Sequence, residues 1–163
     1  MGFKISGSRP SNDLQKIADY FLCISSEAGK PISNKKLQKL VYYAQAWSLV
    51  FTNNKLFDDP IEAWLHGPAI RSLWQKYKDY GYLPIQKKTY KPALTSDDER
   101  SLLDEVWRVY GKHDADYLEA LTHSEEPWLS ARQGLDSNEM SATEIDPSVM
   151  KEYYALLKKK QVE

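Results

Sequence analysis

The sequence predicts a mainly α-helical protein: a single-domain bundle of about six helices around a central hydrophobic helix at about residues 33–52, with a small β-hairpin-like element. Three observations support this fold class. Apolar residues recur at three- and four-residue steps, and capping residues and glycines bracket the resulting segments. The chain has 163 residues and 42% hydrophobic content, which is enough for one core. We expect residues 1–10 to form an N-terminal arm and residues 11–163 to form one domain.

The central helix is predicted from two neighbouring apolar stripes. The first contains Leu37, Leu40, Val41, Ala44, Trp47 and Phe51. The second contains Tyr43, Ala46 and Val50. A helix that is apolar on two faces must be covered on two faces, so we expect it at the centre of the core. Ser33 is its expected N-cap, because its hydroxyl can accept a hydrogen bond from a first-turn N–H.

The other helices are predicted from their start and stop signals together with their periodicity. Besides the central helix, we expect helices over about residues 11–28, 69–80, 96–110, 114–126 and 146–160, and a short helical turn over 127–132. Ser11 and Ser96 are the expected N-caps of the first and fourth helices, and Asp114 lies at the start of the fifth. Gly67 permits an unusual backbone turn, and Pro68 is expected to form the first turn of the third helix.

Four short segments are predicted to be extended: Leu56–Phe57, Ile61–Trp64, Tyr82–Ile85 and Thr89–Pro92. The prolines limit the last two segments to the edge of a sheet. The sequence therefore allows at most a small pair of strands beside the helical body.

No residues form a recognisable catalytic or metal-binding pattern. The three histidines, His66, His113 and His123, lack metal-ligand spacing, and the lone Cys23 is expected to be a small buried hydrophobe. The seven glycines fall at the ends of elements and form no phosphate-binding loop. We therefore expect no enzyme, no metal and no cofactor.

Nucleic acid and membrane are both disfavoured as partners. The chain carries a net charge of −1, and the central helix has no polar face for reading base edges. No apolar run is long enough to span a bilayer, and a single cysteine fits the reducing cytoplasm. Residues 1–92 carry 14 Lys and Arg against 7 Asp and Glu, so the remainder is acidic. This asymmetry indicates either two interaction faces or two halves that pack on each other.

Two features could mark a binding surface. Lys35, Lys36 and Lys39 lie in the first turn of the central helix, either as a solubilising surface end or as a basic patch for an acidic partner. The sharp turn at His66-Gly67-Pro68 lies between Trp64 and Trp74. Trp64 is expected either in the core or, with Trp74, on a partly exposed aromatic ledge that anchors a protein partner.

Several of these residues resemble a known family. The run Lys36-Leu37-Gln38-Lys39-Leu40-Val41-Tyr42-Tyr43-Ala44-Gln45-Ala46-Trp47, followed by Ile61-Glu62-Ala63-Trp64-Leu65-His66-Gly67-Pro68, is similar to the Panacea domain of SocA-like antitoxins and phage-associated proteins. The later Thr122-His123-Ser124-Glu125-Glu126-Pro127-Trp128 resembles a third segment of that family. The motif residues that we expect to be structural are Leu37, Leu40, Tyr43, Trp47, Gly67, Pro68, Pro127 and Trp128.

The resemblance implies a small helical cytoplasmic antitoxin that binds and neutralises a cognate protein toxin, often encoded beside it. The alternative that it implies is a protease adaptor or phage-associated interaction protein, one branch of the family delivering its toxin to a AAA+ protease. The resemblance supplies no catalytic residues and names no toxin. The oligomeric state stays open, with a homodimer included.

Overall fold

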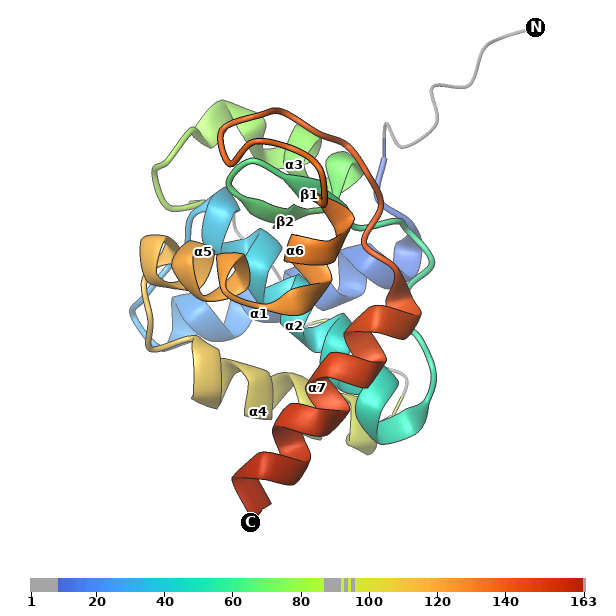
Figure 1. The fold of residues 1–163 in the computed structure, drawn as a ribbon. Coiled ribbons are helices and arrows are strands. Elements are labelled where there is room, and N and C mark those ends of the chain that lie inside the picture. The colour runs from blue at the N-terminus through green and yellow to red at the C-terminus, as the bar shows by residue number, and fades with distance from the viewer. Residues whose placement is uncertain (1–8, 87–91, 93, 95, 163) are drawn as a thin grey trace, which may run out of the picture.

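The computed structural model describes residues 9–86, 92, 94 and 96–162. Within this part of the chain, the structure has seven α-helices and a two-stranded hairpin, which lies between α3 and α6 in Figure 1. The helices are α1 (Asn12–Glu27), α2 (Asn34–Thr52), α3 (Arg71–Tyr77), α4 (Asp97–Tyr110), α5 (Ala115–His123), α6 (Glu126–Ala131) and α7 (Pro147–Val162). The strands are β1 (Glu62–Trp64) and β2 (Gly67–Ala69), and a 3-10 turn at Lys78–Tyr80 extends α3.

Helix α2 is the centre of the fold, as predicted. It contacts α1, α3, α4, α5, α7 and strand β2. Leu37, Leu40 and Tyr43 are completely buried along its length, and Trp47 is partly buried. Burying each large apolar side chain contributes roughly 1.5–3 kcal/mol, so α2 contributes much of the core. Phe51, which was predicted in the same stripe, is 54% exposed because it lies in the last turn of the helix.

The predicted caps form as expected. The hydroxyl of Ser33 accepts a hydrogen bond from Lys36 N at 3.2 Å. Ser11, Ser96 and Asp114 cap α1, α4 and α5 in the same way. Each cap satisfies a first-turn N–H that would otherwise lack a partner.

The hairpin corrects two predictions. Pro68 was expected in the first turn of a helix beginning near Ala69, but it pairs with Ala63 in the hairpin, and Ala69 belongs to β2. The reason is a distant side chain: Gln38 Oε1 accepts a hydrogen bond from Ile70 N at 2.8 Å, which keeps the chain extended to that point. Helix α3 therefore begins only at Arg71.

The other segments that were predicted to be extended form no strand pair within the described residues. Leu56–Phe57 is held by Gln45, whose side-chain amide accepts from Leu56 N and donates to Phe57 O, both at 2.7 Å. Pro84 makes a single bridge to Ser33, and Ile85 N donates to Ile32 O. In the segment Thr89–Pro92, the first three residues lie outside the described part of the chain. Ile61–Trp64 was correctly predicted, since β1 lies within it.

Helix α7 is fastened to α2 by a buried polar cluster. Tyr43 and Tyr154 both donate their hydroxyl hydrogen bonds to Glu125 Oε1, at 2.8 and 2.7 Å. The Tyr43 ring also stacks on Tyr110, with 3.9 Å between centroids, and Trp47 Nε1 donates to the Tyr110 hydroxyl at 2.9 Å. Burial raises the pKa of Glu125, and the two tyrosine hydrogen bonds oppose this rise. The cluster joins α2, α4, α6 and α7 into one body.

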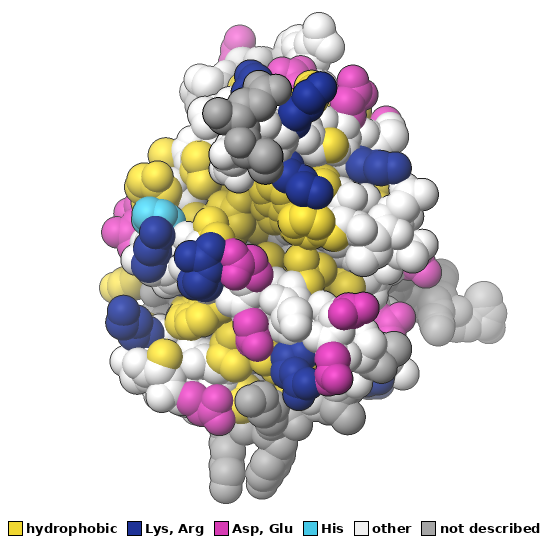
Figure 2. Space-filling view, turned by 90° about the horizontal axis from the view of Figure 1, so that it is seen from below, with side chains coloured by type: hydrophobic (Ala, Val, Ile, Leu, Met, Phe, Trp, Pro, Cys, Tyr) yellow, Lys and Arg dark blue, Asp and Glu magenta, His cyan; other side chains and the backbone are white. Residues whose placement is uncertain are grey.

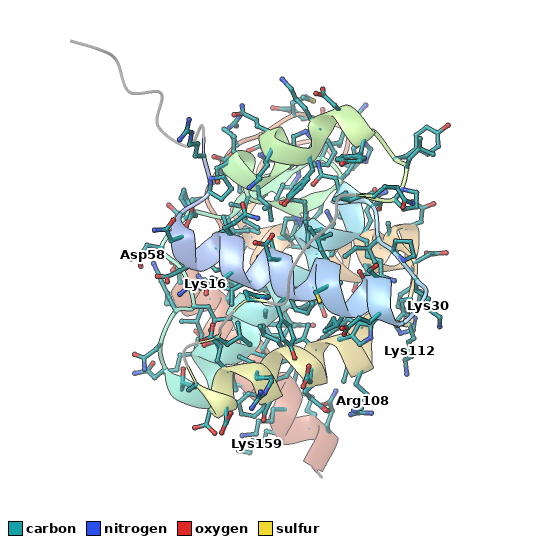
Figure 3. All side chains as sticks on the ribbon, turned by 180° about the vertical axis from the view of Figure 1, so that it is seen from behind. Lys16, Lys30, Asp58, Arg108, Lys112 and Lys159 are labelled. Carbon is teal, nitrogen blue, oxygen red and sulfur yellow. The ribbon has the colours of Figure 1, made fainter. Side chains whose placement is uncertain are left out.

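The outer faces differ in character. Seen from below, apolar side chains gather between charged ones near α4 and α7 (Figure 2), where Phe51, Leu102 and Val109 line a shallow groove. Seen from behind, α1 crosses the molecule, and one edge of this view carries Lys30, Lys112 and Arg108 (Figure 3). Among the described residues, no helix is both long enough and apolar enough to cross a bilayer.

Candidate protein-binding site

A pocket of about 700 Å³ opens beside the hairpin. Its walls come from the N-terminal half of α2, the hairpin turn, the start of α3 and residues 140–142. In Figure 1, the chain between α6 and α7 arches over the hairpin at this place. Ala63 N donates to Thr143 O and Ile145 N donates to Ile61 O, both at 2.8 Å, which holds the arch in place. We call this site the Trp64–Trp74 pocket.

The two tryptophans meet at this pocket. Their ring centroids lie 5.9 Å apart in an edge-to-face arrangement, and both side chains are half-buried. Trp64 Nε1 donates to Glu62 Oε1 at 2.7 Å, and Arg71 lies over the Trp64 ring while pairing with the same oxygen. Of the two alternatives for Trp64, the geometry matches the partly exposed ledge and not full burial in the core.

Lys39 is a buried side chain and does not belong to an exposed basic patch. It is 2% exposed, and its Nζ donates to Pro68 O at 3.2 Å. The side chain passes close to Gly67, where an added Cβ would lie 2.6 Å from Lys39 Cε. Gly67 has φ +108°, a conformation that L side chains rarely adopt, so both space and backbone require glycine there. Burial lowers the pKa of Lys39 to about 7.

The other two lysines of the predicted patch point to different neighbours. Lys35 pairs with Asp116 and Glu119 of α5, and Glu119 Oε2 also lies 3.3 Å from Nδ1 of the exposed His66. Lys36 donates to Gly111 O at 2.6 Å and lies over the Trp107 ring, away from the pocket. The three lysines therefore form no common exposed basic surface. Lys35 and Lys39 share one face of α2, but Lys39 is buried and Lys35 is paired with carboxylates, while Lys36 points to a different neighbour.

Of the residues expected to be structural, Gly67 lines the pocket and Trp128 supports the hairpin beside it, whereas Tyr43 and Trp47 lie in the buried cluster of α2. Trp128 Nε1 donates to Trp64 O at 2.8 Å, and its ring stacks on His123 and contacts the guanidinium of Arg132. Pro127 is buried in the first turn of α6. Arg132 also donates to Ala63 O at 3.0 Å. Helix α6 thus contacts the hairpin through Trp128, so the third motif lies beside the second in the fold.

Sequence reasoning missed four residues at this site: Gln38, Arg71, Glu119 and Met140. Gln38 gave a usable signal, because a polar residue inside an apolar helix needs hydrogen-bond partners. Arg71 and Glu119 look like ordinary surface charges in the sequence. Met140 comes from a polar loop about 70 residues away and gave no signal; it is 80% exposed at the pocket rim.

In the part of the chain that the structure describes, no three His, Cys, Asp or Glu side chains gather closely enough to hold a metal ion. Cys23 is buried in α1, as expected. What the pocket offers to a partner is two indole rings, one buried amine and a rim of paired charges.

Comparison with known proteins identifies the family of this chain. The family model described as "Antitoxin SocA-like, Panacea domain" matches residues 37–129, from the first turns of α2 to α6. Antitoxin SocA of Caulobacter vibrioides is 26% identical over an alignment 160 residues long, and the alignment covers 91% of this chain and 85% of that protein. No solved structure matches the chain. The matched segment contains the central helix, the hairpin and the third motif, and the chain belongs to the SocA-like antitoxin family with the Panacea domain.

Proposed function

We propose that this protein is an antitoxin that neutralises a cognate protein toxin by direct contact, with the Trp64–Trp74 pocket as the centre of the contact. Membership of the SocA-like family supports the antitoxin role. We choose this surface as the toxin-binding face because two half-buried tryptophans lie on an open pocket of about 700 Å³. The encounter is proposed for the cytoplasm, and no catalytic residue is assigned.

The pocket is suited to anchoring a protein because it is held in shape before binding. Arg71 and Glu62 fix the Trp64 ring, and Trp128 holds the backbone behind it. Rings that are already ordered lose little conformational entropy on binding. Tryptophans in partly closed pockets frequently contribute about 2 kcal/mol or more to an interface, so roughly thirty-fold in affinity is expected from one ring.

Neutralisation would be steric in this proposal. A toxin segment seated in the pocket, against the two indole rings, would bring the surrounding hairpin and helix α3 against the toxin's functional surface. The charges at the rim, from Lys35 and Arg71, are balanced by Glu119 and Glu62. They would set orientation and association rate more than affinity.

The test is co-purification and rescue of growth with the protein encoded by the adjacent gene. Trp74→Ala removes an anchoring ring, while Trp107→Ala removes a half-buried ring on α4, which lines no part of the pocket. The proposal predicts that Trp74→Ala weakens toxin binding roughly thirty-fold and loses rescue, whereas Trp107→Ala keeps both. Equal binding by the Trp74→Ala variant and the unaltered chain would refute this choice of surface.

A second candidate function is that of an adaptor that delivers the toxin to a AAA+ protease. The observation that favours it is a second apolar surface, the shallow groove with Phe51 that Figure 2 shows on the underside. An adaptor needs two faces, whereas a blocking antitoxin needs one. The adaptor role predicts that adding this protein to toxin and protease speeds degradation of the toxin, and that the Phe51→Ser variant does not. An unchanged rate of degradation would exclude the adaptor role.

A further inference from the structure

The Trp64–Trp74 pocket has the size and lining of a site for a small molecule. Its volume of about 700 Å³ falls in the range of about 300–1,000 Å³ that is typical of such sites. Its walls combine two indole rings with one buried amine, that of Lys39. Small-ligand pockets commonly show this combination of apolar walls and a few polar groups that fix orientation.

When it is protonated, Lys39 brings a positive charge to this pocket without an ion-pair partner. Its Nζ has one hydrogen bond, to Pro68 O, although an ammonium group has three N–H donors. Within the described residues, no carboxylate lies within ion-pair distance of this nitrogen, and Glu119, the acidic group that acts on it from farther away, pairs with Lys35. A buried cation without a partner is costly. An anion in the pocket would supply the partner.

We propose that the Trp64–Trp74 pocket binds a small aromatic carboxylate, with the carboxylate on the Lys39 ammonium and the ring against the two indoles. A single negative charge matches the single unpaired ammonium, because Arg71 already engages Glu62 and Lys35 already engages Glu119. A phosphate dianion would bring a second charge with no second cation. An aromatic body is favoured because edge-to-face and offset ring contacts add to simple area burial. This site stands whether or not a toxin uses the same pocket.

The experiment measures binding to the full chain by calorimetry and by chemical shift changes in NMR spectra. Indole-3-acetate is the probe, and indole-3-acetamide is its neutral isostere. We expect saturable binding of the acid, with at least tenfold weaker binding of the amide. Lys39→Met should lose at least tenfold in affinity for the acid and little for the amide, whereas Lys30→Met, at an exposed lysine, should change neither. Trp74→Ala should weaken both probes.

Three results would overturn the proposal: equal affinity for acid and amide, full affinity for the acid in Lys39→Met, or no saturable binding of the acid. The folding of Lys39→Met is checked by urea unfolding, and removal of a buried charge is expected to stabilise it. Toxin binding is measured separately, so failure of the small-molecule site leaves the antitoxin proposal unaffected, and failure of toxin binding leaves the small-molecule site unaffected.

The carboxylate could come from a free small acid or from the terminal residue of a protein chain. N-acetyltryptophan, which resembles a chain end, is therefore compared with indole-3-acetate. Tighter binding of N-acetyltryptophan than of indole-3-acetate supports a site for a chain terminus. Tighter binding of indole-3-acetate supports a site for a free acid.

Discussion

Replacing Lys39 with methionine should make the protein more stable at neutral pH. Methionine is close to lysine in length, and it removes the buried amine while keeping the apolar stem. Burial lowers the pKa of Lys39 from 10.5 to about 7. Between these values the unfolded chain binds a proton that the folded chain does not, so this residue's contribution to stability rises as the pH rises through the window. At pH 7 and below, the amine is therefore at its most destabilising.

The magnitude follows from the width of this window. A tenfold change in the affinity of the amine for its proton corresponds to roughly 1.4 kcal/mol, so Lys39 costs roughly 4 kcal/mol at pH 7 relative to strongly alkaline conditions. The lost hydrogen bond to Pro68 O offsets about 1 kcal/mol of the gain. We expect Lys39→Met to be more stable than the unaltered chain by about 3 kcal/mol at pH 7. The gain should shrink by roughly 2–3 kcal/mol between pH 7.5 and 9.5.

Urea unfolding at pH 7, 8.5 and 9.5, followed by tryptophan fluorescence, measures this difference. Lys30→Met is the control, since it removes a positive charge from an exposed position. A gain for Lys39→Met that stays constant over the whole range would refute the reasoning, because the amine would then be hydrated in the folded protein. A loss of stability at pH 7 would refute it as well.

Two further substitutions test the packing and the buried cluster. Gly67→Ala should lower the free energy of unfolding by about 3 kcal/mol, through backbone strain and displacement of Lys39. Gly29→Ala should lower it by only about 1 kcal/mol, because Gly29 has φ +72° but nothing within 4 Å of an added Cβ. Equal urea midpoints for the two variants would contradict the close packing at Gly67. Glu125→Gln keeps an oxygen that can accept from Tyr43 and Tyr154 but removes a buried charge. Because burial raises the pKa of Glu125 above 4.5, the unaltered chain should lose stability relative to Glu125→Gln as the pH rises from 4.5 toward neutral. Urea unfolding at pH 5 and 7 measures this difference in stability. The same difference at both pH values would mean that Glu125 is well hydrated.

The features that depend on neighbouring residues could be predicted from the sequence. The Ser33 cap and the stripe of Leu37 and Leu40 involve groups within one or two turns, so spacing alone locates them. The same holds for the caps at Ser96 and Asp114. The hairpin could not be located in this way. Its second strand persists because Gln38 holds Ile70 N–H from 32 positions away, and no local rule contains that contact.

The candidate site was predictable only in part. The turn between Trp64 and Trp74 is unusual in the sequence and does bring the two rings together. Lys39 was misjudged, because lysines in a first turn are usually exposed, and burial of this one depends on the missing side chain of Gly67. The basic and acidic halves meet at least once, where Lys35 pairs with Asp116 and Glu119.

The central claim is that the Trp64–Trp74 pocket is the face that meets the toxin. Hydrogen–deuterium exchange of the protein alone and in complex with its toxin tests this most directly. We expect bound toxin to slow exchange in the hairpin, at residues 62–69, and in the arch at residues 140–142. Slowed exchange confined to α4 and α7 on the underside, with the hairpin unchanged, would contradict it.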